Sequence, residues 1–144
     1  MLIDEMLCPS AYVVDGDSLR CGSLRLRLLG IDAPELHGCP SWRICVDGDG
    51  EASRRSLAAG VSNSRITYRV VTIDRFGRSV VIAWAGRTNL SCWQLQRHQA
   101  VYKPRWDNGG LIASAFQLLA GVRRIRTITL LPIESLFLTD RTAG

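Results

Sequence analysis

The chain has 144 residues, of which 47% are hydrophobic and 22% charged, so it is long enough for one domain with a buried core and too apolar to be disordered. Its 18 Lys and Arg residues outnumber 13 Asp and Glu residues, and every cation except Lys103 is an arginine. Because the planar guanidinium suits bidentate phosphate contacts, this bias favours a polyanionic partner, although a basic surface is also common without one. No apolar run is long enough to span a bilayer, so no membrane partner is expected.

The first predicted element is a hairpin. Residues 11–14 (AYVV) are typical of a strand, Asp15-Gly16-Asp17 of a tight turn, and residues 18–21 (SLRC) of the returning antiparallel strand. Asp15 fits a turn residue whose carboxylate caps backbone N–H groups, and the same interpretation is available for Asp17. Residues 1–7, ahead of this hairpin, carry two acids and no basic region, so they do not predict a signal peptide.

A second predicted strand, over residues 24–31, is followed by two carboxylates. Pro34 has no backbone N–H and cannot continue a strand ladder, so the strand should end near Asp32. Asp32 and Glu35 then project into a loop from the end of the strand that carries Arg27. Two acids and a guanidinium at a strand end can hold a hard cation and a phosphate, whereas the simpler alternative is a surface salt bridge beside a turn.

The rest of the chain alternates between loop, helix and strand. Residues 36–50 are interrupted by glycine and proline and are predicted to be a loop. An EF-hand is excluded there, because the twelfth position counted from Asp47 is Ala58 instead of an acid. The elements predicted after this loop are a helix at 51–59 ended by Gly60, strands at 65–73 and 78–84 joined by Asp74-Arg75-Phe76-Gly77, a helix at 90–98 capped by Asn89, an extended segment at 101–104 and a helix at 111–120.

Three charged segments occur in a fixed order, Asp15-Gly16-Asp17-Ser18, residues 27–35 (RLLGIDAPE) and Asp74-Arg75-Phe76-Gly77-Arg78, and Tyr102-Lys103-Pro104 follows them. Together they resemble the staphylococcal nuclease (thermonuclease-like) family, which carries a D-G-D-T/S turn, an R-L-x-G-I/V-D-A/T-P-E strand and a D-R/K-Y/F-G-R hairpin. The resemblance implies a mainly β (α+β) fold, a five-stranded Greek-key barrel of the OB-fold type with about three helices. The pattern of the sequence alone indicates only a β-rich chain with two or three helices. We expect one domain over residues 1–144, with a core at about 10–121 and a divergent tail at 122–144.

The resemblance also implies a metal site. Asp17, Asp32 and the backbone carbonyl of Ala33 would bind Ca²⁺, because a few hard oxygen ligands that leave room for water and phosphate favour this ion. Without a metal, a turn rich in carboxylates is usually only a solvated turn. The prediction rests on all the charged family positions being filled at once.

For catalysis, the resemblance assigns Glu35 as the general base for an attacking water and assigns Arg27 and Arg78 to stabilise charge on the phosphate. The simpler alternatives are that Arg27 pairs with Glu35 or Asp32 and that Arg78 pairs with Asp74. The implied activity is hydrolysis of single- or double-stranded DNA and RNA that leaves 3′-phosphate ends. We expect the protein to act as a monomer.

Substrate binding is predicted for Tyr102, Arg75 and Lys103. Tyr102 matches a family tyrosine whose hydroxyl reaches the substrate phosphate. A second family tyrosine is replaced by Ala100, so one platform for stacking bases is missing. Trp42, in the loop after Glu35, is a candidate for a replacement contact with nucleic acid.

The five cysteines leave two interpretations open. Cys8 and Cys21 flank the first hairpin, and Cys39 and Cys45 bracket one loop. Two disulfides with a free Cys92 would suit a secreted or periplasmic protein, whereas five reduced cysteines would suit the cytoplasm, which the missing signal peptide favours.

Two classes of function remain. The first is a metal-dependent nuclease, and the second is a catalytically weak or inactive module that binds nucleic acid or protein on the same barrel. The intact set of acids favours the enzyme, because a binding module does not need it.

Overall fold

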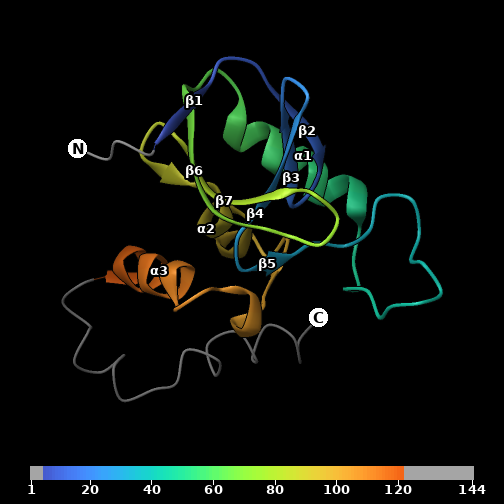
Figure 1. Ribbon diagram of the computed structural model, residues 1–144. Coiled ribbons are helices and arrows are strands. Elements are labelled where there is room, and N and C mark those ends of the chain that lie inside the picture. The colour runs from blue at the N-terminus through green and yellow to red at the C-terminus, as the bar shows by residue number, and fades with distance from the viewer. Residues whose placement is uncertain (1–4, 122–144) are drawn as a thin grey trace.

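The computed structural model describes residues 5–121 as a mixed α/β fold in which one sheet curls into a half-barrel and helices pack around it (Figure 1). The elements in chain order are β1 (Met6–Cys8), β2 (Ala11–Asp15), β3 (Ser18–Cys21), β4 (Leu24–Leu28), β5 (Ile31–Asp32), α1 (Gly50–Val61), β6 (Ile66–Ile73), β7 (Ser79–Ala85), β8 (Thr88–Asn89), α2 (Leu90–Gln96), β9 (Val101–Tyr102), the 3₁₀ helix η1 (Pro104–Trp106) and α3 (Leu111–Gly121). The predicted tail at 122–144 lies outside the described residues.

The main sheet has the strand order β1-β6-β7-β4-β3-β2, and β8 pairs with β7. β4 and β7 run parallel, with Leu26 opposite Ser79, and every other neighbouring pair in this sheet is antiparallel. β5 and β9 form a separate antiparallel ladder in which Asp32 lies opposite Val101. This small ladder places Asp32 beside the segment that leads into η1.

The prediction of one strand over residues 24–31 is wrong at its end. Leu28 and Leu29 are adjacent and each only 1% exposed, so the alternation of faces stops there. Gly30 has φ +79°, and a Cβ atom at this position would lie 3.1 Å from Ile112 Cγ1. The chain therefore turns at a position that favours glycine and leaves the main sheet before Asp32.

The other predicted elements are found, most of them with different ends, while β3 matches the predicted strand at 18–21. The five predicted strands correspond to β2, β3, β4, β6 and β7, and the additional strands among the described residues contain two or three residues each. Asp49 caps α1 by accepting hydrogen bonds from the N–H groups of Glu51 and Ala52. Gly60 was expected to end this helix but lies inside it, where a Cβ would come 2.9 Å from the Trp93 indole. Close packing of α1 on α2 explains this glycine.

Of the two interpretations of the cysteines, the one with two disulfides holds. Cys8–Cys21 joins β1 to β3, and Cys39–Cys45 closes the loop that follows Glu35. Cys92 is free and buried, and burial raises the pKa of its thiol to about 12. Two disulfides in a small domain are typical of extracellular and periplasmic proteins. In the part of the chain that the structure describes, no helix is long and apolar enough to cross a membrane.

Candidate functional site

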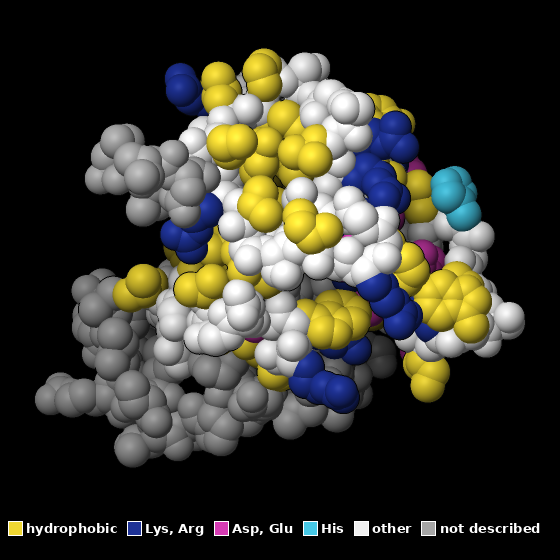
Figure 2. Space-filling model, viewed as in Figure 1, with side chains coloured by type: hydrophobic (Ala, Val, Ile, Leu, Met, Phe, Trp, Pro, Cys, Tyr) yellow, Lys and Arg dark blue, Asp and Glu magenta, His cyan; other side chains and the backbone are white. Residues whose placement is uncertain are grey.

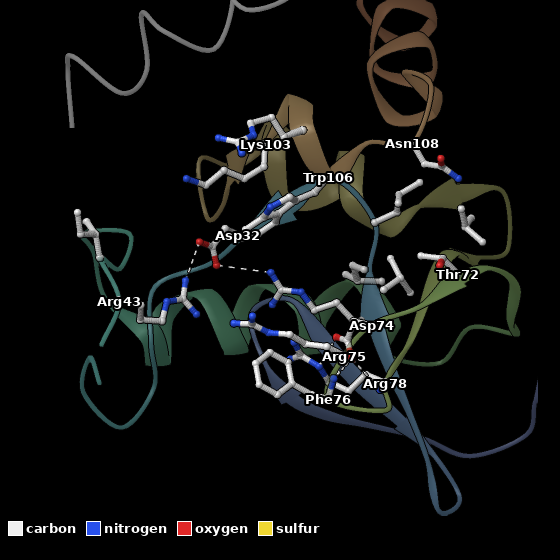
Figure 3. Close-up of a pocket in the computed structure, with 18 of the residues that line it drawn as sticks. Asp32, Arg43, Thr72, Asp74, Arg75, Phe76, Arg78, Lys103, Trp106 and Asn108 are labelled. Atoms are coloured by element: carbon white, nitrogen blue, oxygen red, sulfur yellow. Dashed lines mark hydrogen bonds and ion pairs between the residues drawn. The ribbon is translucent and has the colours of Figure 1, made fainter. Parts of the chain in front are cut away.

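A hollow of about 770 Å³ opens between the end of β4, the β6–β7 turn and η1. Phe76, Arg75 and Arg78 lie together on one wall, whereas Lys103 and Trp106 lie on the opposite wall (Figure 3). The lining is strongly basic, with two acids, Asp32 and Asp74, against the cations Arg27, Arg43, Arg75, Arg78, Lys103 and Arg105. Figure 2 shows Lys and Arg side chains following one side of the molecular face, with large apolar side chains beside them. The hollow therefore suits an anionic ligand.

Arg27 connects the two predicted metal ligands. One guanidinium nitrogen lies 2.8 Å from Asp17 Oδ2, and the other lies 3.6 Å from Asp32 Oδ1 and donates to the Ile31 carbonyl at 3.0 Å. The guanidinium also lies over the Trp106 ring, 5.3 Å from its centroid. The alternative in which Arg27 pairs with a neighbouring acid thus describes part of its environment. Its position also keeps Asp17, which does not line the hollow, close to Asp32, which does.

Asp17 is held by the β2–β3 turn. Asp15 Oδ1 accepts hydrogen bonds from the Asp17 N–H at 3.2 Å and the Ser18 hydroxyl at 2.7 Å, as expected of a turn residue. Asp17 is 4% exposed and points inward, where it accepts a hydrogen bond from the Ala33 N–H at 2.8 Å. Burial raises the pKa of the Asp17 carboxyl to about 7, against the opposing effect of the Arg27 guanidinium. A bound cation would offset the energetic cost of this desolvation, because it would stabilise the ionised carboxylate.

Asp32 is 2% exposed at the end of β5. Its Oδ2 accepts a hydrogen bond from Arg43 at 3.0 Å, whereas its buried Oδ1 accepts none from the described residues. An unsatisfied buried carboxylate oxygen is costly, so Oδ1 is an available ligand for a cation.

Arg43 is a site residue that the sequence interpretation missed. It lies in the loop closed by Cys39–Cys45 and contacts Asp32 with one nitrogen and Glu35 Oε2 with another, the latter at 3.2 Å. Figure 3 shows it reaching Asp32 from the side opposite the β6–β7 turn. The spacing of Cys39 and Cys45 was the signal that could have located it, because a disulfide between them closes this loop and returns the chain toward Glu35.

The β6–β7 turn positions the second predicted catalytic arginine. Asp74 Oδ1 accepts from the N–H groups of Phe76 and Arg78, each at 2.9 Å, and Asp74 Oδ2 accepts from Arg78 Nε at 2.8 Å. The guanidinium carbons of Arg75 and Arg78 lie 5.0 and 5.5 Å from the centroid of the Phe76 ring. The simpler alternative for Arg78 therefore holds as well, but among the described residues only its Nε pairs with a carboxylate, and the side chain still lines the hollow.

Tyr102 is not placed as its predicted role requires. Its side chain is 4% exposed, and its hydroxyl donates to Asp107 Oδ2 at 2.6 Å instead of facing the hollow. Asp107 is itself fully buried and accepts from the N–H groups of Ile112 and Ala113 at the start of α3. Tyr102 thus serves the packing of α3, whereas Lys103 lines the hollow and lies over Trp106, and its role as a substrate contact stays a prediction.

The donor set fits a hard cation in part. Asp17 and Asp32 both lie beside the Arg27 guanidinium, and Asp32 Oδ1 has no hydrogen-bond partner among the described residues. The Ala33 N–H donates to Asp17, which keeps the Ala33 backbone close to that carboxylate. Among residues 5–121, no three His, Cys, Asp or Glu side chains form a metal cluster. A cation here would therefore need backbone, water or substrate oxygens as further ligands, which Ca²⁺ accepts.

Comparison with known proteins gives one distant relative. No family model matches the chain. It is 33% identical over 121 residues to the succinoglycan biosynthesis protein ExoI of Rhizobium meliloti (strain 1021), and the match covers 78% of this chain and 60% of that protein. The chain thus spans about three-fifths of the length of that relative.

Proposed function

We propose that this protein is a calcium-dependent nuclease of the thermonuclease-like type, which hydrolyses phosphodiester bonds in DNA and RNA. The observation that carries the proposal is the convergence of Asp17 and Asp32 on Arg27 at the edge of a basic hollow. A phosphodiester is anionic and resists attack by water, so its hydrolysis requires charge neutralisation and a positioned base. The hollow offers cations for the first need and a nearby carboxylate for the second.

The fold proposal is an OB-type barrel. The five longer strands of the main sheet are β2, β3, β4, β6 and β7. They lie side by side in the order β2-β3-β4-β7-β6, and β4 and β7, the third and fifth of them along the chain, run parallel. This arrangement supports a five-stranded Greek-key barrel. Such barrels commonly bind oligonucleotides across one face, which is consistent with a hollow beside β4 and the β6–β7 turn.

The proposed roles follow the side chains. Asp17, Asp32 and the Ala33 carbonyl would hold Ca²⁺, which when bound supplies Lewis-acid polarisation of a phosphoryl oxygen. Glu35 would take a proton from the attacking water while the oxygen of that water forms a bond to phosphorus. The P–O5′ bond then breaks, the leaving oxygen takes up a proton, and the phosphate stays on the 3′ end. Arg27, together with Arg78 from the opposite wall, would stabilise the added negative charge.

A second candidate function needs no catalysis. A catalytically weak or inactive module that binds nucleic acid would use the same basic hollow, and the occupation of Asp32 and Glu35 by Arg43 favours it. The name of the relative suggests a role in succinoglycan biosynthesis, but that name specifies no reaction for these residues.

We also propose an extracellular or periplasmic location, which the two disulfides support.

The test is cleavage of a single-stranded oligonucleotide with Ca²⁺ and with a chelator, comparing the unmodified protein with Glu35→Gln. Loss of a positioned base should lower the rate by about 10²- to 10⁴-fold. Glu51→Gln is the matched control, because this exposed carboxylate on α1 pairs only with Arg54 and Arg55 among the described residues. Retained binding without cleavage by the unmodified protein would reject the enzyme and leave the binding module.

A further inference from the structure

The disulfide-closed loop at 39–45 presents two large apolar side chains to solvent at the edge of the hollow. Trp42 is 66% exposed and Ile44 is 96% exposed, and both line the hollow together with Arg43. Single exposed apolar residues are common, but two on one crosslinked loop beside a basic hollow indicate a contact surface.

Three constraints preorganise this loop. The Cys39–Cys45 disulfide closes it, the Arg43 N–H donates to the Pro40 carbonyl at 3.3 Å within it, and the Arg43 guanidinium fastens it to Asp32 and Glu35. An aromatic ring on a loop held in this way loses little conformational freedom when a ligand stacks on it. The backbone that carries Trp42 is therefore held in place beside the hollow.

The charge of the hollow selects the ligand. An apolar protein surface would have to desolvate the six cations that line it, and a neutral sugar would stack on the ring without using them. A single-stranded nucleic acid uses both features, because its phosphates meet the cations and its unpaired bases offer flat faces for stacking.

We propose that Trp42 forms a stacking subsite for an unpaired nucleobase of the strand whose phosphate contacts Arg27 and Arg78. This rests on the proposed binding of a phosphodiester in the hollow but not on its cleavage. The subsite lies on a different segment from Ala100, where the stacking tyrosine is missing, so it restores base stacking by another route. It favours single strands over duplex, because a paired base cannot leave its partner without an energetic cost.

The experiment measures binding by fluorescence anisotropy in the presence of a chelator, so that no strand is cut. The probes are a labelled single-stranded oligodeoxynucleotide, an abasic strand of equal length and the corresponding duplex. Trp42→Ala should weaken binding of the single strand by about 5- to 150-fold, the range expected for loss of one base–aromatic stack. Its effect on the abasic strand and on the duplex should stay below about 2-fold.

Two control variants separate stacking from loop structure. Trp42→Phe retains a ring and should recover most of the affinity, whereas Ser41→Ala changes an exposed side chain of the same loop that does not line the hollow and should leave the preference for bases unchanged. Equal losses for the normal and abasic strands, or no loss for either, would overturn the subsite. Competition by alginate that depends on Trp42 would also overturn it, because the ring would then recognise sugar.

The outcomes distinguish the subsite from the proposed enzyme. A base-dependent effect of Trp42→Ala in a protein that cuts nothing would retain the subsite and reject the nuclease. Calcium-dependent cleavage with no effect of Trp42→Ala would retain the nuclease and reject the subsite. No binding of any oligonucleotide would reject both.

Discussion

Replacing Arg43 by glutamine should tighten the binding of Ca²⁺. Arg43 donates to Asp32 Oδ2 at 3.0 Å and lies 3.2 Å from Glu35 Oε2. A cation that binds both oxygens of Asp32 must therefore displace the Arg43 guanidinium, and one that binds Oδ1 alone must tolerate its positive charge nearby. A hydrogen bond to a charged group contributes about 1.5–3 kcal/mol, and an exposed ion pair about 0–1 kcal/mol. The Arg43 side chain is 26% exposed, and we therefore estimate about 1–2 kcal/mol for the displacement, or roughly 5- to 30-fold in the dissociation constant.

The assay is calorimetric titration of Ca²⁺ into metal-stripped protein. Arg105→Gln is the matched control, because it removes the same charge from the same hollow, and Arg105 forms no ion pair within residues 5–121. Equal tightening in both variants would show a general effect of charge and not competition at Asp32. Weaker binding in Arg43→Gln would refute the reasoning, since Arg43 would then be holding Asp32 in place for the cation.

Three further predictions concern stability. Partial burial works to raise the pKa of Asp74, but hydrogen bonds from the backbone N–H and guanidinium of Arg78 hold it below its usual value; Asp74→Asn should therefore cost about 1–2 kcal/mol at pH 7. Urea unfolding at several pH values should show this difference beginning to shrink near about pH 4, where the carboxyl of the unfolded chain is protonated, and disappearing only below the lowered pKa of the folded state. Leu57→Ala, at a fully buried position of α1, should lower the free energy of unfolding by about 2–5 kcal/mol, and a loss below about 1 kcal/mol would contradict its place in the core. Replacing Cys39 and Cys45 by serine opens a crosslink between cysteines six residues apart and should lower the free energy of unfolding by about 2 kcal/mol, whereas a reducing agent should leave the unfolding of this double variant less affected than that of the unmodified chain.

Local rules predicted the elements well where the signal lies within a few residues. The Asp-Gly turn produced the first hairpin, Asn89 caps α2 by accepting from the Cys92 N–H, and β-branched residues formed β6. The errors occur where a distant segment decides the outcome. Gly60 does not end α1 because it packs on Trp93, and the strand after Leu28 breaks because the chain meets Ile112.

The candidate site also contains residues whose position was predictable from nearby sequence and residues whose position depends on distant segments. Asp17, Arg27 and Asp32 were predicted together, and they do meet. The pairing of β3 with β4 brings Asp17 beside Arg27, whereas the turn at Gly30 takes Asp32 out of the main sheet and back toward Arg27. Nothing in the sequence indicated that Tyr102 would turn away from the hollow, and the sequence interpretation did not identify Arg43 at all. The hydroxyl of Tyr102 is taken by Asp107, whose burial depends on where α3 packs.

The sequence by itself determined the turns, the helix caps, the charge of the chain and the order of its acidic and basic segments, because each depends on residue type and short spacing. Only the tertiary structure decided that a crosslinked loop brings Arg43 onto two carboxylates and leaves Trp42 exposed beside them. The physical reason is that a side chain's partners are set by the packing of segments distant in the chain. A carboxylate in a turn and a carboxylate in a basic hollow have the same sequence signature, and they differ only in what surrounds them.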